Sequence, residues 1–321
     1  MASRNLTEIW ILSQTTGNSA DDRWAGFLVS VECLIGFGML CAVITGCRKL
    51  KNLQTPFGML MLNQNISQLL ACVDSGSFFF FGVLLNLDFV MDRNGVFGLI
   101  SIFLLPIILG SFFLMSLNRL CATTFIFAYD KIFKKRNIII FVVGNWIFSL
   151  ASCSYVFLSR KCSFVFYRHG WFFTGALYND TCRDFIVSYN FLIQISLTAS
   201  IFFFDIVTLV VLVFLRNRIY NKQNAVIRRR ELRFAGQVLI QGVVFLAHGF
   251  WYDKGYSLLP GNDERWKYFF TSSFSSNLLH VFDPLVVFLF NPEFRTWMSK
   301  FFTKHHKVNV TAAVSTAASR S

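Results

Sequence analysis

Seven long apolar stretches divide this chain of 321 residues. They cover about residues 24–47, 56–85, 96–127, 138–158, 185–215, 234–251 and 266–290. An α-helix rises about 1.5 Å per residue, so each stretch is long enough to cross a hydrocarbon core of ~30 Å. The pattern therefore predicts an all-α membrane protein built as a bundle of seven transmembrane helices.

The segments between these stretches alternate between basic and neutral. Of the 30 Lys and Arg residues, twenty fall on one side of the expected membrane, together with only three of the 17 Asp and Glu residues. The other side holds ten cations and ten acids, and four acids lie within the stretches: Glu32, Asp74, Asp205 and Asp283. Because basic loops stay in the cytoplasm, we expect the amino terminus outside and the carboxyl terminus inside a cell membrane.

Composition excludes several classes of function. A chain that is 55% hydrophobic and only 15% charged does not form a soluble domain. In a soluble protein a net charge of +13 would suggest a nucleic-acid partner. Here the positive charge gathers on one side of the membrane, where it sets orientation and faces anionic lipid. We therefore expect membrane lipids, and no nucleic acid, among the partners.

The ends of the chain differ from the 24–290 bundle. Residues 1–23 lack the apolar core of a cleaved signal peptide and are expected outside. Apolar residues then recur at helical spacing within 291–307: Phe294, Trp297, Met298, Phe301 and Phe302. With basic residues between them, they predict an amphipathic helix on the inner membrane face. Residues 308–321 are small and polar, which predicts a disordered tail.

Cysteines and glycosylation sequons support this orientation. Cys162 and Cys182 are the only cysteines in an expected outer loop, so we predict that they form a disulfide, worth ~3 kcal/mol in the chain-entropy model. The sequons at Asn5 and Asn179 are also expected outside and can be glycosylated. The sequon at Asn309 is expected inside, where it would stay unmodified.

The outer loop between the two cysteines is rich in aromatic rings, and two interpretations remain open. Its rings are Phe164, Phe166, Tyr167, Trp171, Phe172, Phe173 and Tyr178. Rings beside a bilayer commonly lie at the membrane interface. A loop tied across the mouth of the bundle can instead act as a lid over a pocket.

The inner end of the third stretch carries the most informative motif. Two runs lie there: Asn118-Arg119-Leu120-Cys121-Ala122 and Tyr129-Asp130-Lys131-Ile132-Phe133. An arginine at a helix end can simply snorkel to the interface. At the inner end of the third of seven helices, however, it resembles the acid-Arg-aromatic triplet of rhodopsin-like G-protein-coupled receptors, with Asn118 in place of the acid. The fuller string resembles the nematode serpentine receptor class X chemoreceptors.

The resemblance extends along most of the chain. Further similar runs are Pro56-Phe57-Gly58-Met59-Leu60, Trp146, the outer cysteine pair, Arg228-Arg229-Arg230-Glu231, Gln237-Val238-Leu239 and Phe290-Asn291-Pro292-Glu293-Phe294-Arg295. There are also departures. Gln68 stands where rhodopsin-like receptors carry an Asp that helps to hold sodium, and Asp283-Pro284 is not followed by the usual Tyr. A sodium-linked switch is therefore not expected.

The resemblance implies a chemosensory G-protein-coupled receptor, located in the cilia of chemosensory neurons. Its partners would be a small environmental chemical outside and a heterotrimeric G protein inside, with no cofactor and no metal. The residues implied in coupling and activation are Arg119, Asn118, Tyr129, Asp130, Asp283 and Pro284. From their depth in the helices, Phe97, Ser101, His248, Tyr252 and Phe274 are expected to line the ligand pocket. We expect Asp283 to hold the bend at Pro284 by hydrogen bonding.

Three other classes of protein fit the sequence less well. A seven-helix transporter or channel is the main alternative, although we find no paired repeats and no broken helices at the midplane. An opsin needs a lysine buried in the seventh helix, but Lys267 lies at its outer edge. The chain is not expected to be an enzyme, because it carries no metalloprotease, phosphate-loop or serine-elbow motif.

Overall fold

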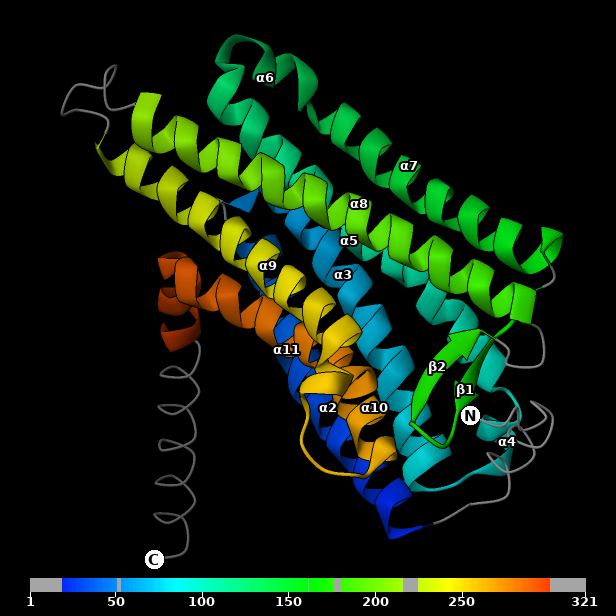
Figure 1. Cartoon of the computed structure of the whole chain (residues 1–321). Coiled ribbons are helices and arrows are strands. Elements are labelled where there is room, and N and C mark those ends of the chain that lie inside the picture. Colours follow the sequence, from blue (N-terminus) through cyan, green and yellow to red (C-terminus); the bar gives the residue numbers. More distant parts are fainter. Residues whose placement is uncertain (1–18, 51–52, 161, 176–179, 216–224, 301–321) are drawn as a thin grey trace, which may run out of the picture.

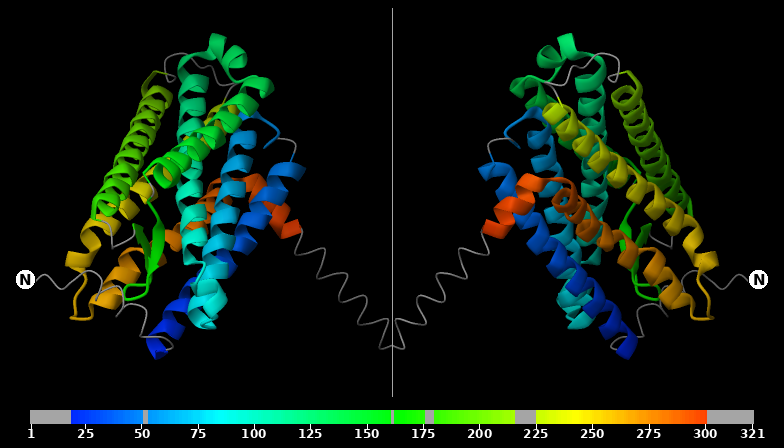
Figure 2. Two further views of the ribbon diagram at one scale, coloured as in Figure 1. Left: turned by 90° about the vertical axis from the view of Figure 1, so that its right-hand side faces the viewer. Right: turned by 90° about the vertical axis from the view of Figure 1, so that its left-hand side faces the viewer.

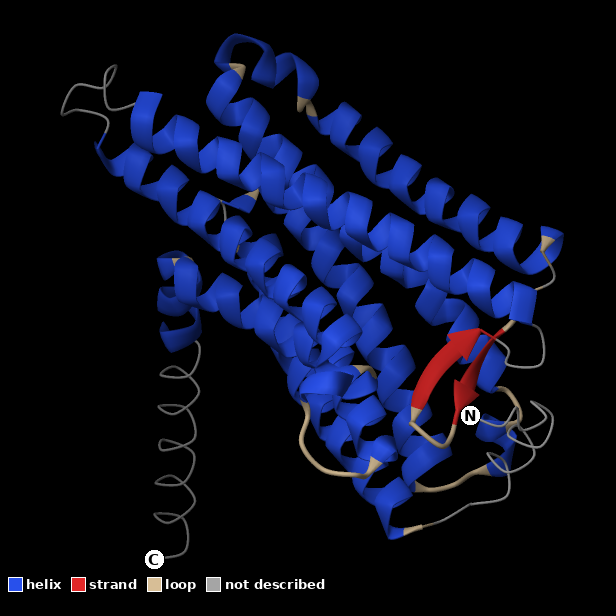
Figure 3. Cartoon of the chain, in the orientation of Figure 1, coloured by secondary structure: helices blue, strands red, loops and turns tan. Residues whose placement is uncertain are grey.

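A computed structural model describes residues 19–50, 53–160, 162–175, 180–215 and 225–300. They form an elongated helical bundle with one small β-hairpin at one end (Figures 1 and 3). The long elements are α2 (Ala20–Lys49), α3 (Pro56–Ser77) with η2 (Phe78–Leu84), α5 (Asn94–Thr124), α7 (Lys135–Ser154) with η3 (Tyr155–Ser159), α8 (Asp180–Val210) with η4 (Val211–Leu215), α9 (Ala225–Leu258), α10 (Glu264–Thr271) and α11 (Ser273–Phe290). The short ones are α4 (Asp88–Met91), α6 (Ile126–Ile132), β1 (Phe164–Tyr167) and β2 (Phe172–Gly175).

The two ends of the bundle carry different elements. The end of the bundle that carries β1 and β2 is called the outer end, and the end that carries α6 is called the inner end, following the orientation that the charges predict. Helix α5 lies in the middle and packs against α3, α7 and α8. Helix α9 packs between α8 and α11, and α11 packs in turn against α2. The long helices therefore close into one bundle.

Local sequence explains where several helices begin. Ser19 caps α2: its hydroxyl accepts a hydrogen bond from the Asp22 amide, and the Asp22 carboxylate accepts one from the Ser19 amide. This reciprocal pair satisfies two amides that the first turn of a helix would otherwise leave open. Thr55 caps α3 by accepting from the Gly58 amide, and Pro56 occupies the first helical position, where its fixed φ suits the helix.

Close approach of the helices depends on small and polar residues. A Cβ atom at Gly110 of α5 would lie 2.1 Å from the Asn145 side-chain oxygen of α7, so only glycine permits this contact. Asn145 donates to the Ile107 carbonyl at 2.9 Å, and Trp146 of the same helix donates its indole N–H to Asn63 of α3 at 3.0 Å. These bonds join α7 to the bundle. Much of the remaining surface of α7 is apolar and exposed.

Six of the described helical segments are long and apolar enough to cross a membrane. They are Ala20–Lys49, Pro56–Leu84, Asn94–Thr124, Lys135–Leu158, Leu192–Val213 and Glu264–Phe290. Large apolar side chains stand exposed on them, such as Leu34, Leu158 and Phe203 at 71%, 77% and 62% exposure. This is the surface that a hydrocarbon environment covers.

Helix α9 is not among these six segments, a count that covers only the part of the chain that the structure describes. It is long enough at 34 residues. Its apolar character is reduced by Gln237, Gln241 and His248. Gln237 and Gln241 are at most 2% exposed, and His248 contacts Ser276 of α11 at 3.2 Å. Since these polar groups face the bundle, α9 can still occupy the seventh position between α8 and α11.

The chain is helical again over residues 292–300, after a break at Asn291. Figure 1 shows this orange-red segment turned away from the direction of α11. Phe294 is fully buried there, whereas Arg295 and Lys300 are exposed. The other residues of the expected amphipathic helix, 301–307, lie outside the described residues, as does the expected tail 308–321.

Candidate functional site

The inner end of α5 packs Asn118 and Arg119 against residues from α3 and α6. Arg119 is only 6% exposed, and its guanidinium carbon lies 3.7 Å from the centre of the Phe57 ring. Asn118 is fully buried and donates from its side-chain amide to the Tyr129 hydroxyl at 3.2 Å. A cation that is removed from water and stacked over an aromatic ring is stabilised by ~2 kcal/mol. The uncharged Asn118 cannot form an ion pair with Arg119, so Phe57 provides a non-ionic partner.

The expected inner residues therefore divide into two groups. Asn118, Arg119 and Tyr129 belong to this cluster, whereas Asp130 is exposed. Sequence reasoning also missed Phe127, which is 99% exposed on α6. The sequence signal for this residue is an aromatic side chain beside the basic inner loop. In the described part of the chain, no neighbouring helix covers Phe127.

Asp283 lies at the centre of the bundle and joins three helices. Its carboxylate accepts hydrogen bonds from the side-chain amides of Gln64 on α3 and Gln241 on α9. It is only 4% exposed. The expectation that Asp283 serves the bend of its own helix misses these two partners. Both glutamines lie within predicted spans, and a polar side chain in an apolar stretch is the sequence signal for such a contact.

The neighbourhood of Asp283 has two further features. A cavity of about 10 Å³ lies beside the carboxylate, lined by Gln241, Phe245, Leu279 and others, and is large enough for about one water molecule. Pro284 removes the amide that would pair with the His280 carbonyl. Helix α2 approaches that carbonyl at Gly36, where an added Cβ would lie 3.2 Å from the His280 oxygen. Four helices, α2, α3, α9 and α11, thus meet near Asp283 and Pro284.

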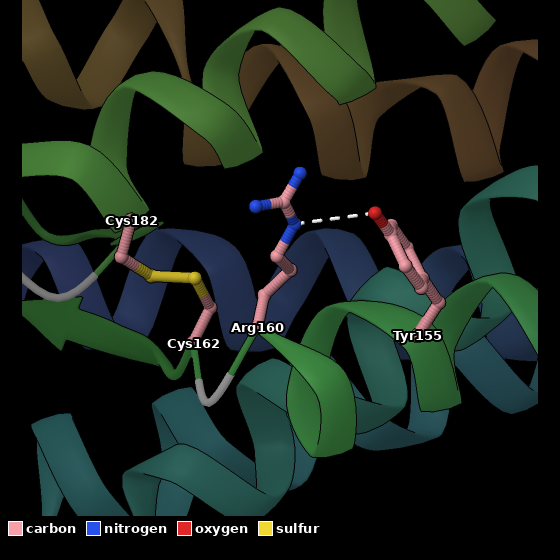
Figure 4. The surroundings of a disulfide bond; sticks show 4 residues. All are labelled: Tyr155, Arg160, Cys162 and Cys182. Carbon is pink, nitrogen blue, oxygen red and sulfur yellow. Dashed lines mark hydrogen bonds between the residues drawn. A yellow bond between two sulfur atoms is a disulfide. The ribbon is translucent and has the colours of Figure 1, made fainter.

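The outer loop is tied to the bundle by the predicted disulfide. Cys162 and Cys182 are bonded, with their Cα atoms 5.4 Å apart, which confirms the pairing (Figure 4). Arg160 lies beside the bond: its Nε donates to the Tyr155 hydroxyl at 3.2 Å, and its guanidinium lies 4.7 Å from the centre of the Phe185 ring. The bond thus holds the start of the hairpin segment to the start of α8.

Several rings of this loop pack into the bundle, while Tyr178 lies outside the described residues. Strands β1 and β2 pair antiparallel, with Phe166 opposite Phe173. Trp171 is fully buried and Phe166 is 8% exposed, so these two rings do not lie at the membrane interface. The centre of the Phe78 ring, on η2, lies 4.7 Å from that of Phe166 and 4.9 Å from that of Phe173. The hairpin therefore fills the outer mouth, as a lid would.

A charged latch holds the tip of the hairpin. The buried Asp22 carboxylate accepts from the Trp171 indole N–H at 2.7 Å and from Arg265 at 2.9 Å, and Arg168 lies 3.7 Å away. The Arg265 guanidinium also lies 4.1 Å from the Trp171 ring centre. Burial, and then the charge of Arg265, lower the pKa of His169, so the neighbouring imidazole is neutral at physiological pH. Asp22, at the start of α2, is a residue that sequence reasoning did not single out.

The five expected pocket residues lie at the outer half of the bundle in different settings. The Ser101 hydroxyl donates to the Asp74 carboxylate at 3.0 Å, and His248 contacts Ser276 at 3.2 Å. Tyr252 is 52% exposed on α9.

The two phenylalanines of that set belong to one ring cluster with the hairpin. The centre of the Phe97 ring lies 5.2 Å from that of Phe78, and Phe274 packs against Phe269 and Phe270. Asn5 and Asn179, the expected glycosylation sites, lie outside the described residues.

A seven-helix bundle with a disulfide-tied outer loop and an arginine at the inner end of its third helix has the rhodopsin-like fold. The crystal structure of squid rhodopsin matches this chain with a TM-score of 0.69 over 90% of this chain and 88% of that chain. The two sequences are only 16% identical, so this likeness shows the fold alone.

Sequence comparison then gives the family. The family described as "Serpentine type 7TM GPCR chemoreceptor Srx" matches residues 27–291, and the chain belongs to it. Serpentine receptor class X-43 of Caenorhabditis elegans is 52% identical over 302 residues, which are 94% of this chain and 94% of that relative. The resemblance inferred from the inner motifs is therefore confirmed.

Proposed function

We propose that this protein binds a small environmental chemical at its outer half and activates a heterotrimeric G protein at its inner end. Membership of a chemoreceptor family supports a receptor. The observation that carries the coupling step is the buried Arg119, stacked on Phe57 beside Asn118. An arginine that is desolvated at the inner mouth is available to a partner only after the inner ends of the helices separate.

Once released from Phe57, Arg119 offers five N–H donors to a partner. The terminal carbonyls at the carboxyl end of a Gα helix are suitable acceptors, because that end carries partial negative charge. The exposed Phe127, on the short helix α6 that follows α5 at the inner end, supplies an apolar contact. The same surface therefore offers a charged and an aromatic contact to one protein partner.

The proposed ligand lies among Phe97, Ser101, His248 and Phe274. Rings provide most of this surface, which favours an apolar molecule with one or two polar groups. To shift the receptor, the ligand must bind one helix arrangement more tightly than the other. We place this receptor in the ciliary membrane of chemosensory neurons, as its family suggests.

The test is GTP exchange on purified Gα heterotrimers, with the receptor in lipid nanodiscs and with a panel of volatile and water-soluble chemicals. We expect the wild type to accelerate exchange and Arg119→Glu to abolish the acceleration, because the carboxylate repels the acceptors that Arg119 would meet. Phe127→Ala should reduce exchange about tenfold, as expected for the loss of an aromatic interface contact.

Arg136→Glu is the matched control, since Arg136 is an exposed arginine at the inner end of α7. It should retain exchange. If Arg119→Glu and Arg136→Glu behave alike, Arg119 has no special role in coupling. If the wild type is silent with every Gα type but moves solute across vesicles, the protein is a transporter or channel.

A further inference from the structure

A long apolar groove lies at the inner half of the bundle, between α2 and the helical segment 292–300. Figure 2 shows this orange-red segment against the blue helix α2 in both views. The groove has a volume of about 560 Å³. Its lining residues are Leu34, Ile35, Gly38, Met39, Cys41, Ala42, Thr45, Phe288, Trp297 and Met298. It belongs neither to the outer ring cluster nor to the inner arginine cluster.

Two glycines of α2 shape the groove in opposite ways. A Cβ at Gly46 would lie 2.1 Å from the buried Phe294 ring, so this glycine lets segment 292–300 seat closely against α2. A Cβ at Gly38, two turns earlier, would meet nothing within 4 Å. The segment is thus held at one end of the groove, while the missing side chain at Gly38 leaves the floor open.

The lining suits a hydrocarbon chain. Besides the indole N–H of Trp297, its polar side chains are Thr45 and Cys41, and the Thr45 hydroxyl already donates to the Cys41 carbonyl at 2.7 Å. The walls continue onto Leu34 and Ile35, which are 71% and 50% exposed on a face of α2 suited to lipid. A polar occupant would leave its own groups unpaired here, whereas an acyl chain has none to pair.

The inner rim of the groove is cationic. Arg48 and Lys49 end α2 within one turn of Gly46, and Arg295 and Lys300 lie on segment 292–300. All four are exposed, and no ion pair within the described part of the chain involves them. A basic cluster at the end of an apolar groove attracts an anionic headgroup, by about 1 kcal/mol for each Lys or Arg near the surface.

We propose that this groove is a binding site for an anionic phospholipid of the cytoplasmic leaflet. One acyl chain lies over Gly38 between α2 and Trp297, and the headgroup phosphate lies among Arg48, Lys49 and Arg295. The bound lipid fixes segment 292–300 against α2. This site is independent of the proposed ligand and of coupling to a G protein.

Photocrosslinking of the full-length protein tests the site. The receptor is placed in phosphatidylcholine nanodiscs that contain a trace of a photoactivatable phosphatidylglycerol or of a photoactivatable phosphatidylcholine with the same acyl chains. The labelled peptides are identified by mass spectrometry. We expect the phosphatidylglycerol probe to label residues 34–45 and 297–298 about fivefold more than the phosphatidylcholine probe does.

Matched variants separate the groove from ordinary lipid contact. Gly38→Leu fills the floor and should reduce this labelling at least to the level of the phosphatidylcholine probe. Gly144→Leu is the control, because a Cβ at Gly144 on α7 also meets nothing within 4 Å. The triple change Arg48→Gln, Lys49→Gln and Arg295→Gln should remove the preference for phosphatidylglycerol. Changing Lys134, Lys135 and Arg136 to Gln removes the same amount of charge and should leave the preference for phosphatidylglycerol unchanged.

Two outcomes would overturn the proposal. Equal labelling by both probes means that the groove takes neutral lipid without selection. Cys41 reports the other outcome, since it is the one free cysteine among the described residues that is not buried. If Cys41 of two copies can be joined by a bismaleimide while lipid labelling is absent, a second copy of the chain fills the groove instead.

Discussion

At the scale of single residues, the carboxylate of Asp283 connects several helices. Asp283 accepts from two glutamine amides on two other helices and stands beside the proline of its own helix. The glutamines each present an N–H donor to it, so the arrangement requires an acceptor on both sides. An asparagine of the same size has only one acceptor oxygen and brings a donor to the other side.

We therefore predict that Asp283→Asn destabilises the bundle by about 1–3 kcal/mol, the cost of leaving a buried polar group unpaired. Thermal unfolding of the receptor in nanodiscs measures this as a lowered Tm. Asp253→Asn makes the same chemical change at an exposed side chain, which is 57% accessible, and should leave the Tm unchanged. Equal behaviour of the two variants would show that the contacts of Asp283 add no stability.

At the scale of elements, the hairpin depends on groups that are far apart in the sequence. Asp22 belongs to α2, Arg265 to α10 and Trp171 to the hairpin turn. Ser273, at the start of α11, also donates to the Trp171 carbonyl at 2.6 Å. Three helix ends therefore hold a loop whose two strands are only four residues long each.

Neutralising the latch should release this element. In Asp22→Asn, the half-buried guanidinium of Arg265 loses its closer anionic partner, which lies at 2.9 Å, and removing one member of a largely buried ion pair is destabilising. We expect backbone amides of residues 164–175 to exchange with deuterium roughly tenfold faster or more, while α5 is unchanged. Asp21→Asn is the matched control, because Asp21 is 48% exposed and lies 3.9 Å from Arg265. Similar exchange in both variants would contradict the latch.

The helices could be predicted from the sequence more fully than the contacts between them. Thr55 and Pro56 predict the start of α3, because capping and a fixed φ are local properties. Helix α9 runs from Ala225 to Leu258, beyond the apolar residues 234–251, since a helix can continue past the hydrocarbon without an apolar signal. The Asp283 cluster could not be predicted, because it depends on the rotation of three helices about their axes.

At the scale of the whole molecule, the distribution of charge predicts orientation. The positions of the basic segments in the sequence predict that the sequons of Asn5 and Asn179 lie on the opposite side of the membrane. We predict that both carry glycans when the protein is made in animal cells. Asn5→Gln and Asn179→Gln should each remove one glycosidase-sensitive step in gel mobility, and Asn309→Gln should remove none. Loss of a step only in Asn309→Gln would reverse the assigned orientation.

The filled outer mouth has a consequence for sensitivity. Any molecule that binds among the rings around Phe78 competes with Phe166 and Phe173, which already occupy that volume. Its apparent affinity is lowered, because it can bind only during the fraction of time for which the hairpin is undocked. The detection threshold of such a sensor is thus set partly by the docking equilibrium of its own loop. A change at the latch would then tune the threshold for every ligand of the proposed site at once, without altering which ligands are recognised.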